Sequence, residues 1–174
     1  SNEGDRPRRL QIFTYFEWLL GTASDWHREF HRTFINTEYD AEHGAILATK
    51  AMWDLPVEGS KTHWNRDWGF VAFHSASIAP GGFDTDKRDF LGRHGSVASP
   101  RAVREGKSTG RAGRWGDAIG SLRLDLAIPP GGEQAVIFTL GAADSRAAAL
   151  DIVARFKSAA QAGDALRAVE RYWD

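Results

Sequence analysis

Strict alternation of apolar and polar residues predicts a strand over residues 119–128. The two sets of positions point in opposite directions: Leu122, Leu124, Leu126 and Ile128 against Ser121, Arg123 and Asp125. A Pro-Pro-Gly-Gly turn follows at residues 129–132, and residues 135–140 are again mostly apolar. This order predicts an antiparallel hairpin in which residues 135–140 pair with residues 119–128.

Three further segments have the composition of strands. Residues 9–20 are rich in aromatic and β-branched side chains, and apolar residues occupy both faces, so we expect cover on both sides. Residues 45–53 and 68–75 are also strand candidates. Between residues 76 and 118 the alternation fails and Gly, Ser and Arg accumulate. This predicts an irregular, locally basic region with a short helical turn at residues 84–91.

The C-terminal part of the chain changes to helical spacing. Leu150 and Val153 share one helix face, and Asp144 or Ser145 is the candidate N-cap. Asp164, after Gly163, is the candidate cap of a second helix. Strands followed by helices predict a mainly β fold: an antiparallel β-sandwich over residues 8–143 and linker helices over residues 144–174.

The first residues are expected to lie outside the folded domain. Ser1-Asn2 in place of Met is typical of the scar that a cleaved affinity tag leaves. We therefore expect residues 1–7 to be a disordered lead-in. Because strand-like sequence begins almost at once, upstream residues of the natural protein are expected to be missing.

Composition excludes several classes of protein. The 174 residues fit one domain, and 22 Lys and Arg against 23 Asp and Glu argue against a nucleic-acid-binding protein, which normally has a basic excess. No apolar run reaches the roughly 18 residues of a membrane span, so no membrane contact is expected. Without cysteine there is neither a disulfide framework nor a thiolate metal site.

Two short patterns resemble functional motifs but lack their defining features. His27 and His31 have the spacing of zinc ligands on a helix, yet Arg28 stands where the metalloprotease pattern needs Glu. The glycines of residues 110–116 follow neither the dinucleotide-binding nor the P-loop spacing, so we expect a flexible loop. No nucleophile elbow is present either. We therefore assign no catalytic residue, no metal ligand and no cofactor.

Residues 62–68 are the most suggestive segment for binding. In this segment Trp64 and Trp68 flank Asn65, Arg66 and Asp67. Aromatic rings offer apolar faces for sugars, and the polar groups between them suit sugar hydroxyls. The alternative is that Trp68 begins a strand and packs inward while Trp64 seals a loop.

Ordered blocks along the chain resemble glycoside hydrolase family 94, the cellobiose and chitobiose phosphorylase-like family formerly called glycosyltransferase family 36. They are residues 9–18 (RLQIFTYFEW), 36–40, 44–48, 71–73, 83–86, 90–93, 116–122, 130–133, 138–141 and 172–174. The resemblance is specific in the order and spacing of its blocks rather than in any one of them.

The resemblance implies a fold and a set of contacts. Members combine an N-terminal β-sandwich of the supersandwich, galactose-mutarotase-like type with a helical linker and an α/α barrel that holds the catalytic Asp. This chain is similar to the later part of the sandwich and the linker, so no catalytic residue is carried over. Sandwich loops of such enzymes help to wall the active site. This implies carbohydrate contacts for Trp64, Asn65, Arg66, Asp67, Trp115 and Asp117.

Three functions stay open at this point. The first is a non-catalytic, carbohydrate-associated domain of a bacterial phosphorylase, whose parent enzyme uses inorganic phosphate to convert β-linked di- or oligosaccharides to sugar 1-phosphate with inversion. The second is the phosphorylase-like module of a cyclic β-1,2-glucan synthase, and the third is a free-standing carbohydrate-binding module.

The implied partners and location follow from the same resemblance. The partners are an oligosaccharide, the α/α barrel of the same parent chain and, through open sheet edges, a second copy in a homodimer. The expected location is cytoplasmic, with the parent at the inner membrane if it is a synthase.

Overall fold

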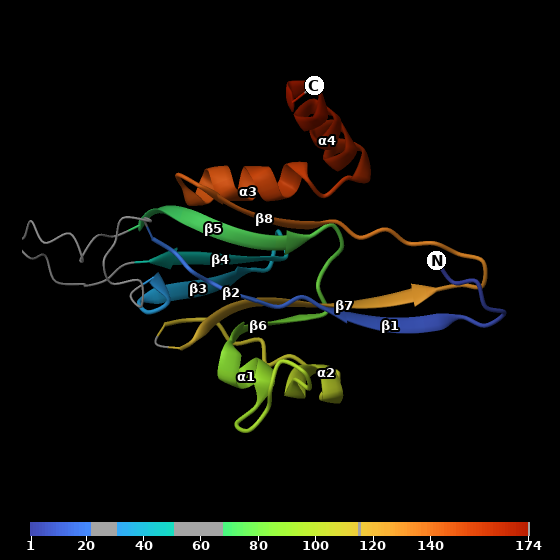
Figure 1. The fold of residues 1–174 in the computed structure, drawn as a ribbon, viewed down its shortest axis with the longest axis horizontal. Coiled ribbons are helices and arrows are strands. Elements are labelled where there is room, and N and C mark those ends of the chain that lie inside the picture. The colour runs from blue at the N-terminus through green and yellow to red at the C-terminus, as the bar shows by residue number, and fades with distance from the viewer. Residues whose placement is uncertain (22–30, 51–67, 115, 174) are drawn as a thin grey trace, which may run out of the picture.

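The chain folds into a sandwich of two antiparallel sheets with helices on both outer faces (Figure 1). The computed structural model describes residues 1–21, 31–50, 68–114 and 116–173. One sheet contains β1 (Arg8–Phe13), β2 (Phe16–Glu17), β6 (Gly82–Asp86) and β7 (Ala118–Ile128). The other contains, in spatial order, β3 (Ile35–Asp40), β4 (Ala45–Lys50), β5 (Trp68–Ala76) and β8 (Phe138–Ala143). The mainly β fold that the sequence predicts is confirmed.

β7 is the central strand of its sheet. β1 and β2 follow one of its edges in a single register, with Phe13 opposite Arg123 and Phe16 opposite Gly120. Arg123 has a second partner, Gly82 of β6, so β6 lies along the other edge of β7. The predicted strand over residues 9–20 is therefore interrupted into two short strands on the same edge.

The predicted hairpin between residues 119–128 and 135–140 is wrong. The turn is present, since the Gly132 N–H donates to Pro129 O at 3.0 Å, but the chain then crosses to the second sheet. There β8 pairs with β5, with Leu140 opposite His74. β1 and β2 fill one edge of β7, and β6 fills the first half of the other. β8 therefore pairs with β5, which offers it a free edge over all six of its residues.

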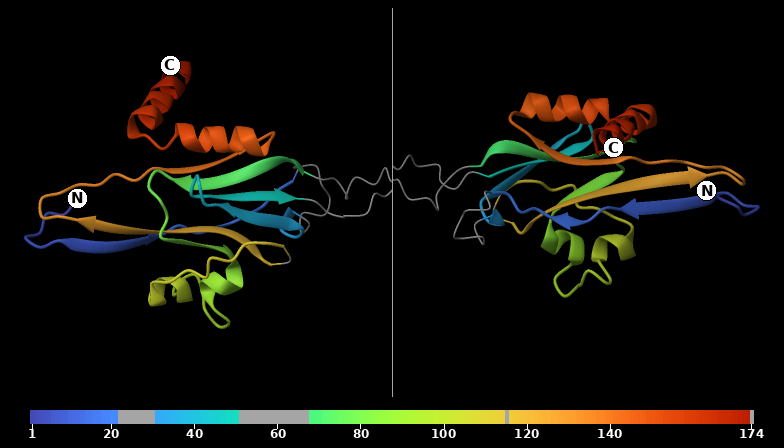
Figure 2. Two further views of the ribbon diagram at one scale, coloured as in Figure 1. Left: turned by 180° about the vertical axis from the view of Figure 1, so that it is seen from behind. Right: turned by 45° about the horizontal axis from the view of Figure 1, so that its top comes forward.

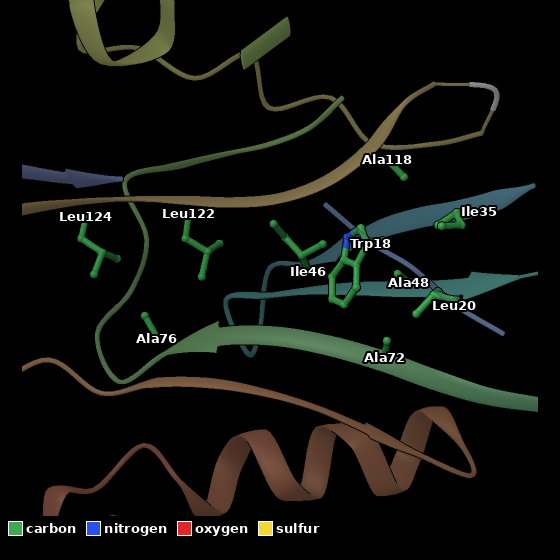
Figure 3. Packing of buried hydrophobic residues seen from close by; sticks show 10 residues of the cluster. All are labelled: Trp18, Leu20, Ile35, Ile46, Ala48, Ala72, Ala76, Ala118, Leu122 and Leu124. Carbon is green, nitrogen blue, oxygen red and sulfur yellow. The ribbon is translucent and has the colours of Figure 1, made fainter. Parts of the chain in front are cut away.

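Apolar side chains from both sheets meet in a core between them (Figure 3). Leu122 and Leu124 point inward from β7, as the alternation predicts, and face Ile46 of β4. Trp18, which directly follows β2, is only 4% exposed and fills the space between the sheets. Ser121 is fully buried although its position predicts exposure, because the segments that follow β6 cover that face of the sheet.

Helices cover the outer face of each sheet (Figure 2). α3 (Arg146–Arg155) lies on β4 and β5, where Val153 and Leu150 pack with Leu47 and Phe73. Its N-cap is Ser145, one of the two residues expected, whose Oγ accepts from the Ala148 N–H at 3.2 Å. On the other sheet, α1 (Lys87–Leu91) and α2 (Arg101–Glu105) bury apolar side chains against β7.

α4 (Ala159–Trp173) buries none of its residues. It begins before the expected start at Asp164, because the Ala162 N–H already donates to Ser158 O at 3.1 Å. Asp164 binds Arg167 within the helix at 2.6 Å instead of capping it. Among the described residues, no helix combines the length and the apolar character that a membrane crossing needs. That residues 144–174 lead toward an α/α barrel stays a prediction.

The lead-in of residues 1–7 is ordered at Asn2, contrary to the expectation. Asn2 is 2% exposed, and its Nδ2 donates to Arg6 O at 2.8 Å and Ile128 O at 3.0 Å. Its backbone exchanges hydrogen bonds with the turn, since the Asn2 N–H donates to Gly132 O and the Gly131 N–H donates to Asn2 O. These contacts tie the start of the chain to the end of β7.

A chain of hydrogen bonds joins the two sheets at His74. Its Nδ1 lies 3.2 Å from Thr139 O, and because a carbonyl only accepts, Nδ1 carries the proton. Nε2 therefore accepts from Thr14 Oγ1 at 2.9 Å. The Thr14 hydroxyl in turn accepts from the Leu122 N–H at 2.8 Å. The neutral ring thus connects β5 and β8 with the interrupted edge strand and β7.

Candidate functional site

Of the residues predicted to contact sugar, the structure describes Asp117. Trp64, Asn65, Arg66, Asp67 and Trp115 lie outside the described residues, and so does His27. The described residues next to them still show where these segments attach. Trp68 pairs with Lys50, and Lys50 pairs with Ile35, at the same end of the sandwich where β7 begins (Figure 1).

A hollow of about 160 Å³ opens at this end of the sandwich. It lies between β3, the start of β7, the β6–α1 junction and the loop of residues 110–116. Its lining residues are Ile35, Thr85, Asp86, Asp89, Arg111, Ala112, Gly113, Arg114, Gly116 and Ala118. Both sequence neighbours of Trp115 line this hollow, and Asp117 comes directly after the second of them.

The first part of the glycine-containing loop, residues 110–113, is held by hydrogen bonds, whereas the sequence predicts a flexible loop over residues 110–116. The Gly113 N–H donates to Thr37 Oγ1 at 3.1 Å, and Thr37 Oγ1 donates to Thr85 Oγ1 at 2.8 Å. Thr85 Oγ1 donates to Arg111 O at 3.0 Å. The Thr37 N–H also donates to Gly113 O at 3.0 Å. The two threonines, one from each sheet, therefore fix the loop at the mouth of the sandwich.

The β6–α1 junction supplies the acidic side of the hollow. Asp86 is the N-cap of α1, where its Oδ1 accepts from the Arg88 N–H at 2.7 Å. A Cβ on Gly116 would lie 2.1 Å from Asp86 Oδ2, so a larger residue there requires this carboxylate to move. Asp89 Oδ2 lies 3.7 Å from the guanidinium of Arg111, which is mostly exposed. The hollow thus offers carboxylates and a guanidinium side by side.

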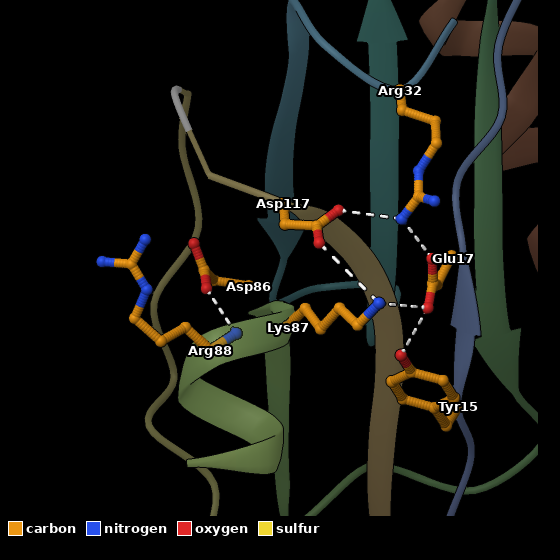
Figure 4. Close-up of polar contacts among 7 residues, drawn as sticks. All are labelled: Tyr15, Glu17, Arg32, Asp86, Lys87, Arg88 and Asp117. Atoms are coloured by element: carbon orange, nitrogen blue, oxygen red, sulfur yellow. Dashed lines mark hydrogen bonds and ion pairs between the residues drawn. The ribbon is translucent and has the colours of Figure 1, made fainter. Parts of the chain in front are cut away.

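A network of charged side chains surrounds Asp117 beside the hollow (Figure 4). Asp117 Oδ1 accepts from Arg32 Nη2 at 3.2 Å, and Arg32 also binds Glu17. Lys87 Nζ donates to Glu17 Oε1 at 2.7 Å and lies 3.8 Å from Asp117 Oδ2. The Tyr15 hydroxyl donates to Glu17 Oε1 at 2.9 Å. Four segments that are distant in sequence therefore converge on two carboxylates.

Tyr15 and Glu17 each keep one protonation state around neutral pH. Burial and the hydrogen bond to Glu17 raise the pKa of Tyr15 to about 12. Hydrogen bonds from Lys87 and Tyr15 lower the pKa of Glu17, so this carboxylate is ionised. Neither group is poised to exchange a proton near pH 7, as a general acid or base would be. The arrangement suits positioning and hydrogen bonding rather than proton transfer.

The described residues contain no group of three or more His, Cys, Asp or Glu side chains placed to hold a metal ion. His31, one half of the zinc-like pair, is 5% exposed and packs against Gly21. The sequence singles out Asp117 but misses Glu17, Arg32 and Lys87. No local pattern marks these three residues, because they come together only in the folded sandwich.

Fold and surface define a class of protein: a two-sheet antiparallel sandwich domain with a polar, charge-lined hollow at one end. The family model "Glycosyl hydrolase 94, supersandwich domain" matches residues 1–159, and the chain belongs to this family.

Two relatives are similar over most of the chain. The cyclic beta-(1,2)-glucan synthase NdvB of Rhizobium meliloti (strain 1021) is 29% identical over 174 residues, which cover 99% of this chain and 6% of the relative. The solabiose phosphorylase of Paenibacillus borealis is 28% identical over 152 residues, covering 87% of this chain and 18% of the relative. The chain therefore spans a small part of the length of either protein.

Proposed function

We propose that this chain is a non-catalytic, carbohydrate-associated domain of a family 94 phosphorylase, with the hollow beside Asp117 as its sugar-contacting surface. The observation that carries the proposal is the lining of the hollow by both neighbours of Trp115. The carboxylate and guanidinium groups that line the hollow suit hydrogen bonds to sugar hydroxyls. The hollow is smaller than the about 300–1,000 Å³ of sites that enclose whole ligands, so it suits part of an oligosaccharide.

The proposal extends to the parent protein. We take it to be a bacterial enzyme that uses inorganic phosphate to cleave β-linked di- or oligosaccharides, with inversion to sugar 1-phosphate. The catalytic α/α barrel then follows in the same polypeptide, and the location is cytoplasmic. No catalytic role is proposed for the described residues, since the ionic network around Asp117 has its partners within the domain.

Similarity to the glucan synthase supports a second candidate, the phosphorylase-like module of a cyclic β-1,2-glucan synthase. The two differ in the sugar that the hollow meets. Titration with cellobiose, chitobiose and linear β-1,2-gluco-oligosaccharides separates them, because each candidate predicts a preference for its own linkage. Equal binding of unrelated oligosaccharides would instead favour a free-standing carbohydrate-binding module.

Tryptophan fluorescence measured during these titrations tests the surface itself. We expect oligosaccharide to change the emission, and we expect Arg111→Ala and Trp115→Phe to weaken that response. Trp173→Phe is the matched control, because Trp173 lies on α4 and is 80% exposed. A response that survives both hollow variants, or that the control alone removes, would contradict the proposed surface.

Phosphate-dependent sugar release tests the absence of catalysis. The purified chain is incubated with inorganic phosphate and each β-linked disaccharide, and sugar 1-phosphate is measured. We expect none. Sustained turnover would show that the chain itself carries an active site, whatever the outcome of the binding experiment.

A further inference from the structure

Four buried polar atoms without a hydrogen-bond partner lie under the segment that leads into the loop of the hollow. Among the described residues, five buried side-chain nitrogen and oxygen atoms lack a protein partner, and four of them are Asp84 Oδ2, Ser108 Oγ, Ser121 Oγ and Arg123 Nε. Unpartnered buried polar atoms are costly, so such groups usually share a ligand or water. Their concentration in one place points to a single binding site.

The four side chains converge on the outer face of the β6–β7 pair. Asp84 lies directly opposite Ser121, and both residues are fully buried, so their side chains share a face of the sheet. Arg123 lies opposite Gly82. A Cβ on Gly82 would lie 3.1 Å from Ser108 Oγ and 3.5 Å from the guanidinium carbon of Arg123. Ser108 and Arg123 therefore flank one point beside the Asp84–Ser121 pair.

Only one of the two carboxylate oxygens of Asp84 accepts hydrogen bonds among the described residues. Its Oδ1 accepts from the Thr109 N–H and from Thr109 Oγ1, both at 2.8 Å. Oδ2 is buried without a partner among the described residues. Burial raises the pKa of Asp84, and the hydrogen bonds from Thr109 oppose this rise, as does the nearby Ser108 hydroxyl. The Ser108 hydroxyl nevertheless does not meet the geometry of a direct hydrogen bond to Oδ2.

The available groups match the hydrogen-bonding capacity of one water molecule. They are one carboxylate acceptor, one guanidinium N–H donor and two hydroxyls that can do either, and buried water typically makes about three bonds. A metal cation would meet a single carboxylate and an adjacent positive charge, a poor ligand set. We propose that one water molecule is bound between Asp84, Ser108, Ser121 and Arg123 and joins the loop to β6 and β7.

The bound water would anchor the beginning of the loop that lines the hollow. Ser108 and Thr109 precede Gly110, whose N–H donates to Phe83 O at 3.0 Å. Thr37 and Thr85 hold the loop further along, at Arg111 and Gly113. The water site thus fixes one end of the loop and the threonine pair fixes the other. This inference does not depend on sugar binding at the hollow.

Water–protein NOE spectra of the isotopically labelled chain, together with a high-resolution crystal structure, test the proposal directly. We expect cross-peaks between a long-lived water and the amides of Thr109 and Ser121, and density for one water between the four side chains. A direct hydrogen bond from Ser108 or Ser121 to Asp84 Oδ2 with no water present would overturn the proposal. A metal ion in the density would overturn it equally.

Ser121→Val provides the second test, because the valine methyls occupy the space of the water and suit a strand. We expect the cross-peaks to disappear and hydrogen exchange at Thr109 and Gly110 to accelerate about tenfold, the factor that corresponds to one lost hydrogen bond. Amides of the β1–β7 ladder should be unchanged. Ser96→Val, at an exposed serine, is the control. Unchanged exchange in Ser121→Val would contradict an anchoring water.

Discussion

Replacing Val153 by alanine tests whether α3 is held on the sandwich. Val153 is fully buried where α3 packs on Leu47 and Phe73. The substitution removes two methyl groups, each worth about 0.8 kcal/mol when buried, and the cavity that they leave adds about 1 kcal/mol. Alanine returns about 0.5 kcal/mol through its higher helix propensity. We therefore expect the free energy of unfolding to fall by about 2 kcal/mol.

Val169→Ala supplies a matched control, because it makes the same chemical change within a helix. Val169 lies on α4 and is 54% exposed, so the helix-propensity gain remains while little burial is lost. We expect a change within about 0.5 kcal/mol. Urea unfolding followed by circular dichroism measures both variants. Equal effects would show that α3 does not pack on β4 and β5 in solution, and the reasoning would fail.

Three further predictions concern single side chains. Gly116→Ala should displace the Asp86 cap of α1 and cost about 1 kcal/mol in urea unfolding, whereas Gly69→Ala, with open space around it, should not. Burial lowers the pKa of His74, so the unfolded chain binds the extra proton and the free energy of unfolding should fall as pH drops below about 6.5. His74→Gln should flatten that dependence, and an identical pH profile would contradict it. In an ultraviolet titration one tyrosine should ionise near pH 12 and be missing from Tyr15→Phe; full ionisation nearer pH 10 would refute the burial of its hydroxyl.

Local patterns predict the elements of this fold but not all of their partners. The alternation around Leu122 and Leu124 predicts β7 and its inward face, and Ser145 marks the start of α3, because both signals lie within a few residues. The pairing of β8 with β5 could not be read in the same way. It depends on which sheet edges are already occupied, a property of the assembled sandwich.

In the candidate site, too, some residues can be predicted from the sequence and others depend on the assembled fold. The family resemblance points to Asp117 and Trp115, whereas no local pattern marks Arg32 or Glu17. Arg32 and Asp117 are 85 positions apart and come into contact only in the folded sandwich. The burial of Ser121 cannot be predicted from the sequence either, because the segment that covers it has no regular periodicity.

The pairing of β1 and β2 with β7 has a consequence for synthesis on the ribosome. β3 and β4 are adjacent in sequence and can pair as soon as both have emerged, but Thr14 and Leu122 are 108 positions apart. Such long loops close slowly, so β1 and β2 emerge early and must wait until β7 has been translated. Their apolar side chains meanwhile lie open to chaperones and to neighbouring nascent chains. Slowing translation between β6 and β7 should therefore lengthen the period in which this domain is prone to aggregation.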